Sequence, residues 1–150
     1  MFRIVDDYCH MLNKITGVNH KWYSVLWSYQ FWPSFFMFFS SKNSGAPRLI
    51  KIHLKILLRV FYGIETTTRC VFDSMPYLPH PKNIINGAEY IGRDVVIYHN
   101  VTIGAKRIDV KFKERPRIQS GCVIATGAVV VGAGILKANS VARANSLIVL

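Results

Sequence analysis

The sequence feature that most constrains the fold is a six-residue spacing of aliphatic side chains between positions 85 and 148. The spacing runs in two series, first Ile85, Ile91, Ile97 and Ile103, then Ile118, Ile124, Val130, Leu136, Ala142 and Ile148. A fixed short period of this kind is the sequence signature of a parallel β-helix, in which each unit supplies one short strand and one corner. Three units close a triangular coil, and stacked coils bury one continuous aliphatic column.

The residue four positions after each aliphatic position supports the same interpretation. It is small or β-branched in most units, with Glu89 as an exception: Val95, Val101, Cys122, Ala128, Gly134, Ser140 and Ser146. Such a residue fits near a tight corner, so we expect Cys122 to have a packing role. A β-sandwich would instead show period-two alternation with a turn every 8–12 residues or so. The pattern therefore predicts a mainly β fold, a parallel β-helix.

The repeat is interrupted twice. Thr66, Phe72 and Leu78 form a first, imperfect coil, and near His80 the register shifts by one residue before Ile85 starts the next series. The second gap, from position 103 to position 118, is not a multiple of six, which predicts an external loop over about residues 105–117. The loop is rich in basic residues. It is either a solvated surface or a binding face, because solenoids carry insertions on one side.

Residues 1–63 are predicted to form a helical region, followed by the β-helix over residues 64–150. Residues 22–41 carry no charge and are long enough to span a bilayer, but Pro33 and the many aromatic residues argue against spanning. Three alternatives stay open for this segment: helices packed in the protein, contact with a membrane surface, or a true membrane span. Residues 49–62 form a basic amphipathic helix that Gly63 ends. It packs on its own domain or lies on an anionic surface.

Composition limits the partners and the compartment. The net charge of +11 favours anionic partners, but no nucleic-acid-binding motif is present, so we expect no nucleic acid. The three cysteines, Cys9, Cys70 and Cys122, lack metal-ligand spacing, which predicts no metal site and a reducing compartment. No cleavable signal peptide is visible. We expect a cytoplasmic protein, with contact to the inner face of the membrane as an open alternative.

Four short motifs, in this order, carry a resemblance: Tyr77-Leu78-Pro79-His80-Pro81, Ile84-Ile85-Asn86, Ile91-Gly92 and Val101-Thr102-Ile103-Gly104. Over residues 60–150 the chain resembles the hexapeptide-repeat acyltransferases. It is most similar to the serine acetyltransferase branch, which includes O-acetyltransferases of capsule, colanic acid and O-antigen synthesis. The resemblance implies a left-handed β-helix, a rare departure from right-handed crossovers. It also implies acetyl-CoA as donor and a homotrimer with active sites between subunits.

The resemblance also implies catalytic roles for two residues. His80 corresponds to the family's general base, which removes the proton from an acceptor hydroxyl. Glu65, fifteen positions before it, corresponds to the acidic residue that orients the imidazole. We therefore predict His80 and Glu65 as the catalytic pair.

The acceptor side departs from the serine acetyltransferase pattern. Arg115 stands where that branch has a second histidine, and a guanidinium stays protonated, so Arg115 would bind an anion instead. His99 is a second candidate for substrate contact, although a surface position is favoured. The substitution favours a saccharide hydroxyl in surface polysaccharide synthesis. A serine O-acetyltransferase of cysteine biosynthesis and a non-catalytic β-helix scaffold are the alternatives.

The donor site is expected along the later coils. By position, the resemblance assigns the pantetheine arm to Ala125, Thr126, Gly127 and Ala128, and the CoA phosphates to Lys137 and Arg143. Members of the family usually continue past the last coil with a tail that covers CoA. The sequence here stops at Leu150, so we expect that cover to be missing, which supports the scaffold alternative.

Overall fold

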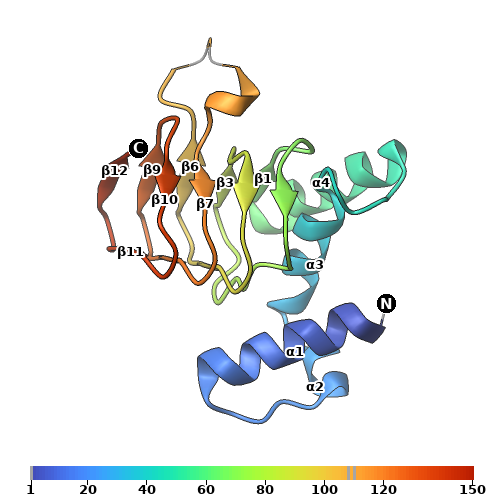
Figure 1. Cartoon of the computed structure of the whole chain (residues 1–150). Helices are drawn as coiled ribbons and strands as arrows, with labels where there is room; N and C mark the ends of the chain where they lie inside the picture. The colour runs from blue at the N-terminus through green and yellow to red at the C-terminus, as the bar shows by residue number, and fades with distance from the viewer. Residues whose placement is uncertain (1, 108, 110) are drawn as a thin grey trace.

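Helices and strands occupy separate parts of the chain (Figure 1). The computed structural model describes residues 2–107, 109 and 111–150, and only the backbone of Phe2 and Arg3. The helices are α1 (Phe2–Thr16), α2 (Trp22–Leu26), α3 (Phe31–Phe39) and α4 (Arg48–Tyr62). The strands are β1 (Glu65–Thr66), β2 (Val71–Phe72), β3 (Ile85–Asn86), β4 (Tyr90–Ile91), β5 (Val96–Ile97), β6 (Thr102–Gly104), β7 (Arg117–Ile118), β8 (Val123–Ile124), β9 (Val129–Val131), β10 (Ile135–Leu136), β11 (Val141–Ala142) and β12 (Leu147–Val149).

The strands form three parallel sheets, which are the three faces of a prism. Face 1 has the order β1-β3-β6-β9-β12, face 2 has β10-β7-β4-β2, and face 3 has β11-β8-β5. A single bridge between Tyr77 and Val96 extends face 3 into the first coil. Because consecutive strands lie on different faces, the chain winds around the prism as a parallel β-helix. The predicted left-handed β-helix with a helical N-terminal region is confirmed.

Three columns of side chains fill the prism, and each column belongs to one face. They are Thr66, Asn86, Ile103, Val130 and Ile148 on face 1, Phe72, Ile91, Ile118 and Leu136 on face 2, and Leu78, Ile97, Ile124 and Ala142 on face 3. All are buried except Ile148, which is half-buried. The predicted inward positions of Thr66, Phe72, Leu78 and the second aliphatic series are therefore confirmed.

The predicted inward position of Ile85 is wrong. Ile85 is 49% exposed, and its neighbour Asn86 is only 2% exposed because Asn86, not Ile85, pairs with Thr66 and Ile103. The amide of Asn86 is satisfied inside the prism. Its Nδ2 donates to Thr66 Oγ1 at 3.2 Å, and its Oδ1 accepts from the backbone N–H of Ala88. A hydrogen-bonded polar residue can thus occupy a position that period six assigns to isoleucine.

The corners use backbone conformations that most residues avoid. Asn83, Asn100, Gly127 and Asn145 have φ between 53° and 70° and follow one another at the corner between faces 3 and 1. Asp94, Gly121 and Asn139 have φ between 54° and 73° and follow one another at the corner between faces 2 and 3. Glycine and asparagine tolerate the left-handed region at low cost. These residues therefore let the chain turn sharply between short strands.

The helices gather at the β1 end of the prism, and β12 lies at the other end (Figure 1). Leu58 of α4 and Met37 of α3 are fully buried and join the core of the β-helix, while α1 packs in a second cluster that includes Tyr77. Gly63 ends α4 with φ 65°, as predicted. Residues 22–41 form the short helices α2 and α3, and no helix in the described ranges is long and apolar enough to cross a membrane.

A loop leaves the prism between β6 and β7, at the corner between faces 1 and 2 (Figure 1). Gly104 ends β6, Arg117 begins β7, and a 3-10 turn, η1 (Phe112–Glu114), lies between them. Ile108 and Val110, inside the predicted loop, lie outside the described residues.

Candidate functional site

Most of the predicted site residues lie along one edge of the prism, the corner between faces 3 and 1. Backbone hydrogen bonds connect the successive turns at this edge: Asn100 N to Lys82 O at 3.1 Å, Gly127 N to His99 O at 3.1 Å and Asn145 N to Thr126 O at 2.9 Å. His80, His99, residues 125–127 and Arg143 therefore follow one another from coil to coil. We call this edge the histidine corner.

His80 is exposed at the first turn of the histidine corner. Its ring centroid lies 5.6 Å from that of His99, edge to face, and 6.2 Å from that of Tyr98. Hydrogen bonds fix the backbone around it: Tyr29 Oη donates to Pro79 O at 2.8 Å, and Lys82 N donates to His80 O at 2.8 Å. The imidazole is thus held on a rigid turn with one side open to a ligand.

His99 is half-buried, more enclosed than the surface position that the sequence favoured. Its Nδ1 is buried and has no hydrogen-bond partner among the residues that the structure describes. Buried polar atoms are usually paired. A ligand at the histidine corner could supply the missing partner.

The four residues predicted to contact the pantetheine arm of the acetyl donor differ in exposure. Ala125, Thr126 and Gly127 are half-buried at the histidine corner, but the side chain of Ala128 is fully buried and points into the prism. Ala128 can therefore offer a ligand only its backbone. Gly127 has φ 70°, and a Cβ there would collide with Asn145 Oδ1.

The two basic residues predicted for the CoA phosphates do not lie together. Arg143 follows β11 and lies on the coil after Ala125, because Ala125 N donates to Ala142 O. Lys137 follows β10 at the corner between faces 2 and 3, where its carbonyl accepts from Cys122 Sγ. Of these two residues, only Arg143 lies at the histidine corner of the same chain.

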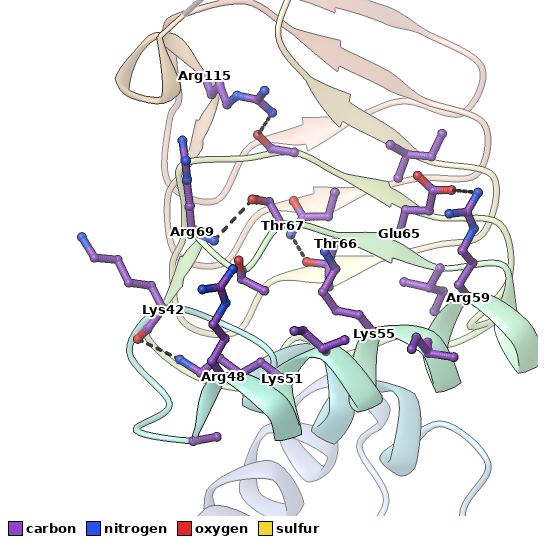
Figure 2. Close-up of a pocket in the computed structure, with 18 residues that line it drawn as sticks. Lys42, Arg48, Lys51, Lys55, Arg59, Glu65, Thr66, Thr67, Arg69 and Arg115 are labelled. Atoms are coloured by element: carbon purple, nitrogen blue, oxygen red, sulfur yellow. Dashed lines mark hydrogen bonds and ion pairs between the residues drawn. The ribbon is translucent and has the colours of Figure 1, made fainter.

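Glu65 and Arg115 line a different part of the surface. Glu65 lies on the outer side of face 1, and its Oε1 pairs with Arg59 Nη2 at 3.3 Å. Within the described part of the chain, no hydrogen bond or ion pair joins Glu65 to His80. Arg115 Nη1 donates to Gly87 O at 3.2 Å, at the corner between faces 1 and 2. Both residues border a pocket of about 1050 Å³ beside α4 (Figure 2).

Sequence reasoning missed two kinds of residue. Tyr98 and Tyr29 contact the His80 turn, and aligning residue 98 with residue 79, one coil of eighteen residues plus the one-residue register shift near His80, could have identified Tyr98. Burial raises the pKa of nearby Tyr77, and Tyr29 and Tyr98 add to the shift, so Tyr77 stays protonated. The pocket also gathers Lys42 and Arg69, which no periodicity connects with α4.

The thiols are not candidate nucleophiles. All three cysteines are free and buried, and burial raises the pKa of Cys122 and raises that of Cys70 to about 12. A protonated thiol neither attacks a carbonyl nor binds metal well. No three His, Cys, Asp or Glu side chains of the described chain come together in a way that would hold a metal ion.

Comparison with known proteins places the fold. No model of a protein family matches the sequence. A serine acetyltransferase of Mycobacterium tuberculosis is 28% identical over 92 residues, which cover 61% of this chain and 40% of that protein. A serine acetyltransferase structure from Neisseria gonorrhoeae superposes with a TM-score of 0.76 at 15% identity, covering 97% of this chain and 57% of the other.

A serine acetyltransferase in complex with CoA superposes with a TM-score of 0.74 at 16% identity, covering 97% of this chain and 60% of that one. The chain therefore has the fold of the serine acetyltransferase-like hexapeptide-repeat acyltransferases, including the helical N-terminal region. It spans less than two thirds of the length of each of these three proteins.

Proposed function

We propose that the protein is an O-acetyltransferase of the serine acetyltransferase type that uses acetyl-CoA as donor. The observation that carries this proposal is the exposed His80 on its rigid turn, next to His99, at an edge of a β-helix with the serine acetyltransferase fold. The names of the M. tuberculosis relative and of the CoA complex support the reaction and the donor.

In the proposed reaction, His80 acts as the general base. An acceptor hydroxyl is a weak nucleophile until its proton is removed, and an imidazole can take that proton at neutral pH. The hydroxyl oxygen then forms a bond to the thioester carbonyl carbon, the carbon–sulfur bond breaks, and CoA leaves as the thiol with the proton that His80 had accepted. At the half-buried turn of residues 125–127, the N–H groups of Ala125 and Gly127 already donate to Ala142 O and His99 O, so the N–H of Thr126 is our candidate for holding the donor.

We keep Glu65 as the predicted orienting residue for His80. In the structure its carboxylate pairs with Arg59, so the proposal requires that this pair open when substrates bind. Both partners are exposed, and exposed ion pairs contribute little stability, typically about 0–1 kcal/mol. Opening the pair would therefore cost little.

For the acceptor, serine is better supported than the saccharide that the sequence favoured, because the relative and the superposed structures are all named as serine acetyltransferases. Arg115 is the observation that keeps a saccharide as second candidate. Its guanidinium is half-buried over Phe112, and it suits an anionic group of a larger acceptor.

The test is a thiol-release assay with acetyl-CoA, serine and a panel of sugars. We expect CoA release with serine, and a decrease of roughly 100-fold or more in kcat for His80→Ala. His53→Ala is the matched control, because His53 is an exposed histidine on α4, and it should stay within about twofold of the wild type. Release with a sugar alone would establish the second candidate.

Full transfer by a folded His80→Ala protein would remove the centre of the proposal. The scaffold alternative predicts that neither acetyl-CoA binding nor thiol release is measurable, even at millimolar CoA.

A further inference from the structure

The pocket beside α4 is strongly basic. It is a groove of about 1050 Å³ between α4 and the outer side of β1 and β3 (Figure 2). Among the residues that the structure describes, seven cationic side chains and a single carboxylate, that of Glu65, line it; the cationic residues are Lys42, Arg48, Lys51, Lys55, Arg59, Arg69 and Arg115. More than half of the chain's net charge of +11 is therefore concentrated here. We call this pocket the basic groove.

The cations come from both sides of the groove. Arg48, Lys51, Lys55 and Arg59 recur every three or four residues, so they form one stripe along α4. At 1.5 Å per residue this stripe is roughly 16 Å long. Arg69 and Arg115 lie on the β-helix side (Figure 2). Like charges at this spacing repel each other, so the arrangement destabilises the free protein unless an anion binds.

The chain itself does little to neutralise these cations. Across the described residues, Arg59 is the one member of the basic groove that has a carboxylate within 4 Å, and that carboxylate is Glu65. Lys51 Nζ reaches only the carbonyl of Lys42, at 3.3 Å. The Nε of Arg115 is buried with no hydrogen-bond partner in the described structure. Several charged donors are thus available to a ligand.

The chemistry of the lining indicates the ligand class. Arginine presents a planar fork that matches phosphate oxygens, and lysine adds point charges. The stripe is longer than a single phosphate, which favours a ligand with more than one. Ile52, Ile56 and Ile85 lie among the charged residues and offer contact to an apolar or ring moiety. We propose that the basic groove binds an organic ligand carrying at least two phosphate groups.

This proposal goes beyond acetyl transfer and does not depend on it. The experiment is isothermal titration of the full chain with inorganic diphosphate and with ADP, and with citrate as a carboxylate probe of similar charge. The wild type should bind both phosphate probes, more weakly as salt rises, and should bind citrate at least tenfold more weakly. Lys51→Gln/Lys55→Gln should lose at least tenfold in affinity, because each lost charge-assisted bond costs several-fold.

The matched control is Lys106→Gln/Lys111→Gln. It removes the same two charges from exposed loop positions outside the basic groove, and its affinity should stay within twofold of the wild type. If Lys51→Gln/Lys55→Gln does not fold, Arg69→Gln tests the other wall, where the residue is exposed in a turn. His80→Ala should bind the phosphate probes like the wild type, so a failed acetyl-transfer assay leaves this result unaffected.

Two further arms identify the source of the phosphates. Phosphatidylcholine vesicles that contain a polyprenyl diphosphate present two phosphates as a lipid headgroup, and ADP presents them in solution. Tighter binding to the vesicles indicates a lipid, and tighter binding to ADP indicates a soluble ligand; both agree with the proposal. No diphosphate binding by the wild type at millimolar concentration, equal loss in the two lysine variants, or equal affinity for citrate would overturn it.

Discussion

Among single residues, Asn86 has the most unusual position, since it is an amide in a column otherwise occupied on later coils by Ile103, Val130 and Ile148. Its Nδ2 donates to Thr66 Oγ1, and its Oδ1 accepts from the N–H of Ala88. Removing the amide leaves both groups buried without a partner. Unpaired buried groups are costly, whereas pairs of polar groups replaced together can be nearly neutral.

We therefore predict that Asn86→Val lowers the free energy of unfolding by about 2 kcal/mol. Thr66→Val should cost less, and the double variant should cost less than the sum of the two, because the Thr66 hydroxyl is no longer left unpaired. Urea unfolding of the three variants measures this coupling. Strict additivity would show that the Asn86–Thr66 bond contributes nothing.

The titration of Cys70 makes the stability of the folded protein depend on pH. Burial raises the pKa of its thiol to about 12, a hydrogen bond from Asn86 opposes this, and Glu89 adds to it, whereas an unfolded thiol titrates near 9.0. Between these values the unfolded chain loses the proton and the folded chain keeps it, so stability falls as pH rises from about 9 towards 12.

From pH 8 to pH 10, the wild type should lose about 1 kcal/mol more unfolding free energy than Cys70→Ala, which lacks the titrating group. Urea midpoints and slopes at the two pH values provide the comparison. Identical losses in the two proteins would mean that the Cys70 thiol titrates in the folded protein as it does in the unfolded chain.

At the scale of the structural elements, the corners depend on what stacks beside them. Gly121 has φ 73°, and a Cβ there would collide with Asn139 Oδ1 of the next coil. Gly45, in the loop before α4, has the same φ of 73° but no atom within 4 Å of an added Cβ. The two glycines therefore separate backbone strain from contact between coils.

Gly45→Ala should cost about 1 kcal/mol from backbone strain alone. Gly121→Ala should cost at least about 1 kcal/mol more, because the Asn139 side chain must move. Adding Asn139→Gly, which tolerates the same left-handed backbone, should remove the excess. Thermal or urea unfolding of the four proteins tests this, and equal costs for the two alanine variants would contradict the role of stacking.

The residues that point into the prism were predictable where the same type of side chain repeats on each coil. They were less predictable where a contact with a neighbouring coil determines which residue is buried. Period six identified Ile91, Ile97, Ile103 and the later series, because the prism interior admits the same aliphatic shape on each coil. It assigned Ile85 wrongly, because the first two coils share a hydrogen-bonded pair, Thr66 and Asn86, that hydropathy does not reveal. The loop was indicated by the broken period, but not its 3-10 turn.

The candidate site was predictable only in part, because some of its residues come together through packing between elements that are distant in the sequence. Motif order gave His80, and coil spacing placed residues 125–127 at the same corner. Coil spacing also implies that Lys137, twelve residues after Ala125, turns at another corner, which the assignment by resemblance did not take into account. Spacing along the chain did not tell that Arg69 and Lys42 join the stripe of α4. Such groupings depend on how helices and coils pack against each other, which a one-dimensional period does not contain.

On the scale of the whole molecule, His80 and Arg115 lie at opposite edges of face 1. His80 is at the histidine corner, and Arg115 is at the corner between faces 1 and 2, bonded to Gly87. Because the width of face 1 separates the two corners, we expect one substrate to contact both residues only when they come from different copies of the chain. The homotrimer that the resemblance implies would provide this, since a cyclic trimer brings unlike edges together at each interface.

This arrangement predicts complementation between two inactive variants. His80→Ala and Arg115→Ala should each be nearly inactive alone, but mixed trimers formed from equal amounts should recover about a quarter of wild-type activity. The fraction follows because a site is intact only when one copy supplies His80 and its neighbour supplies Arg115, each with a probability of about one half in a cyclic assembly.

Co-refolding or co-expression, followed by the thiol-release assay, measures the recovery, and sedimentation equilibrium checks that the mixed species contains three chains. A mixture of His80→Ala with wild type controls for dilution and should retain about half of the activity, since every copy then supplies Arg115 and half of the sites keep His80. If the two variants stay inactive together while the trimer forms, both residues act within one chain or Arg115 does not contact the acceptor, and the shared site is refuted.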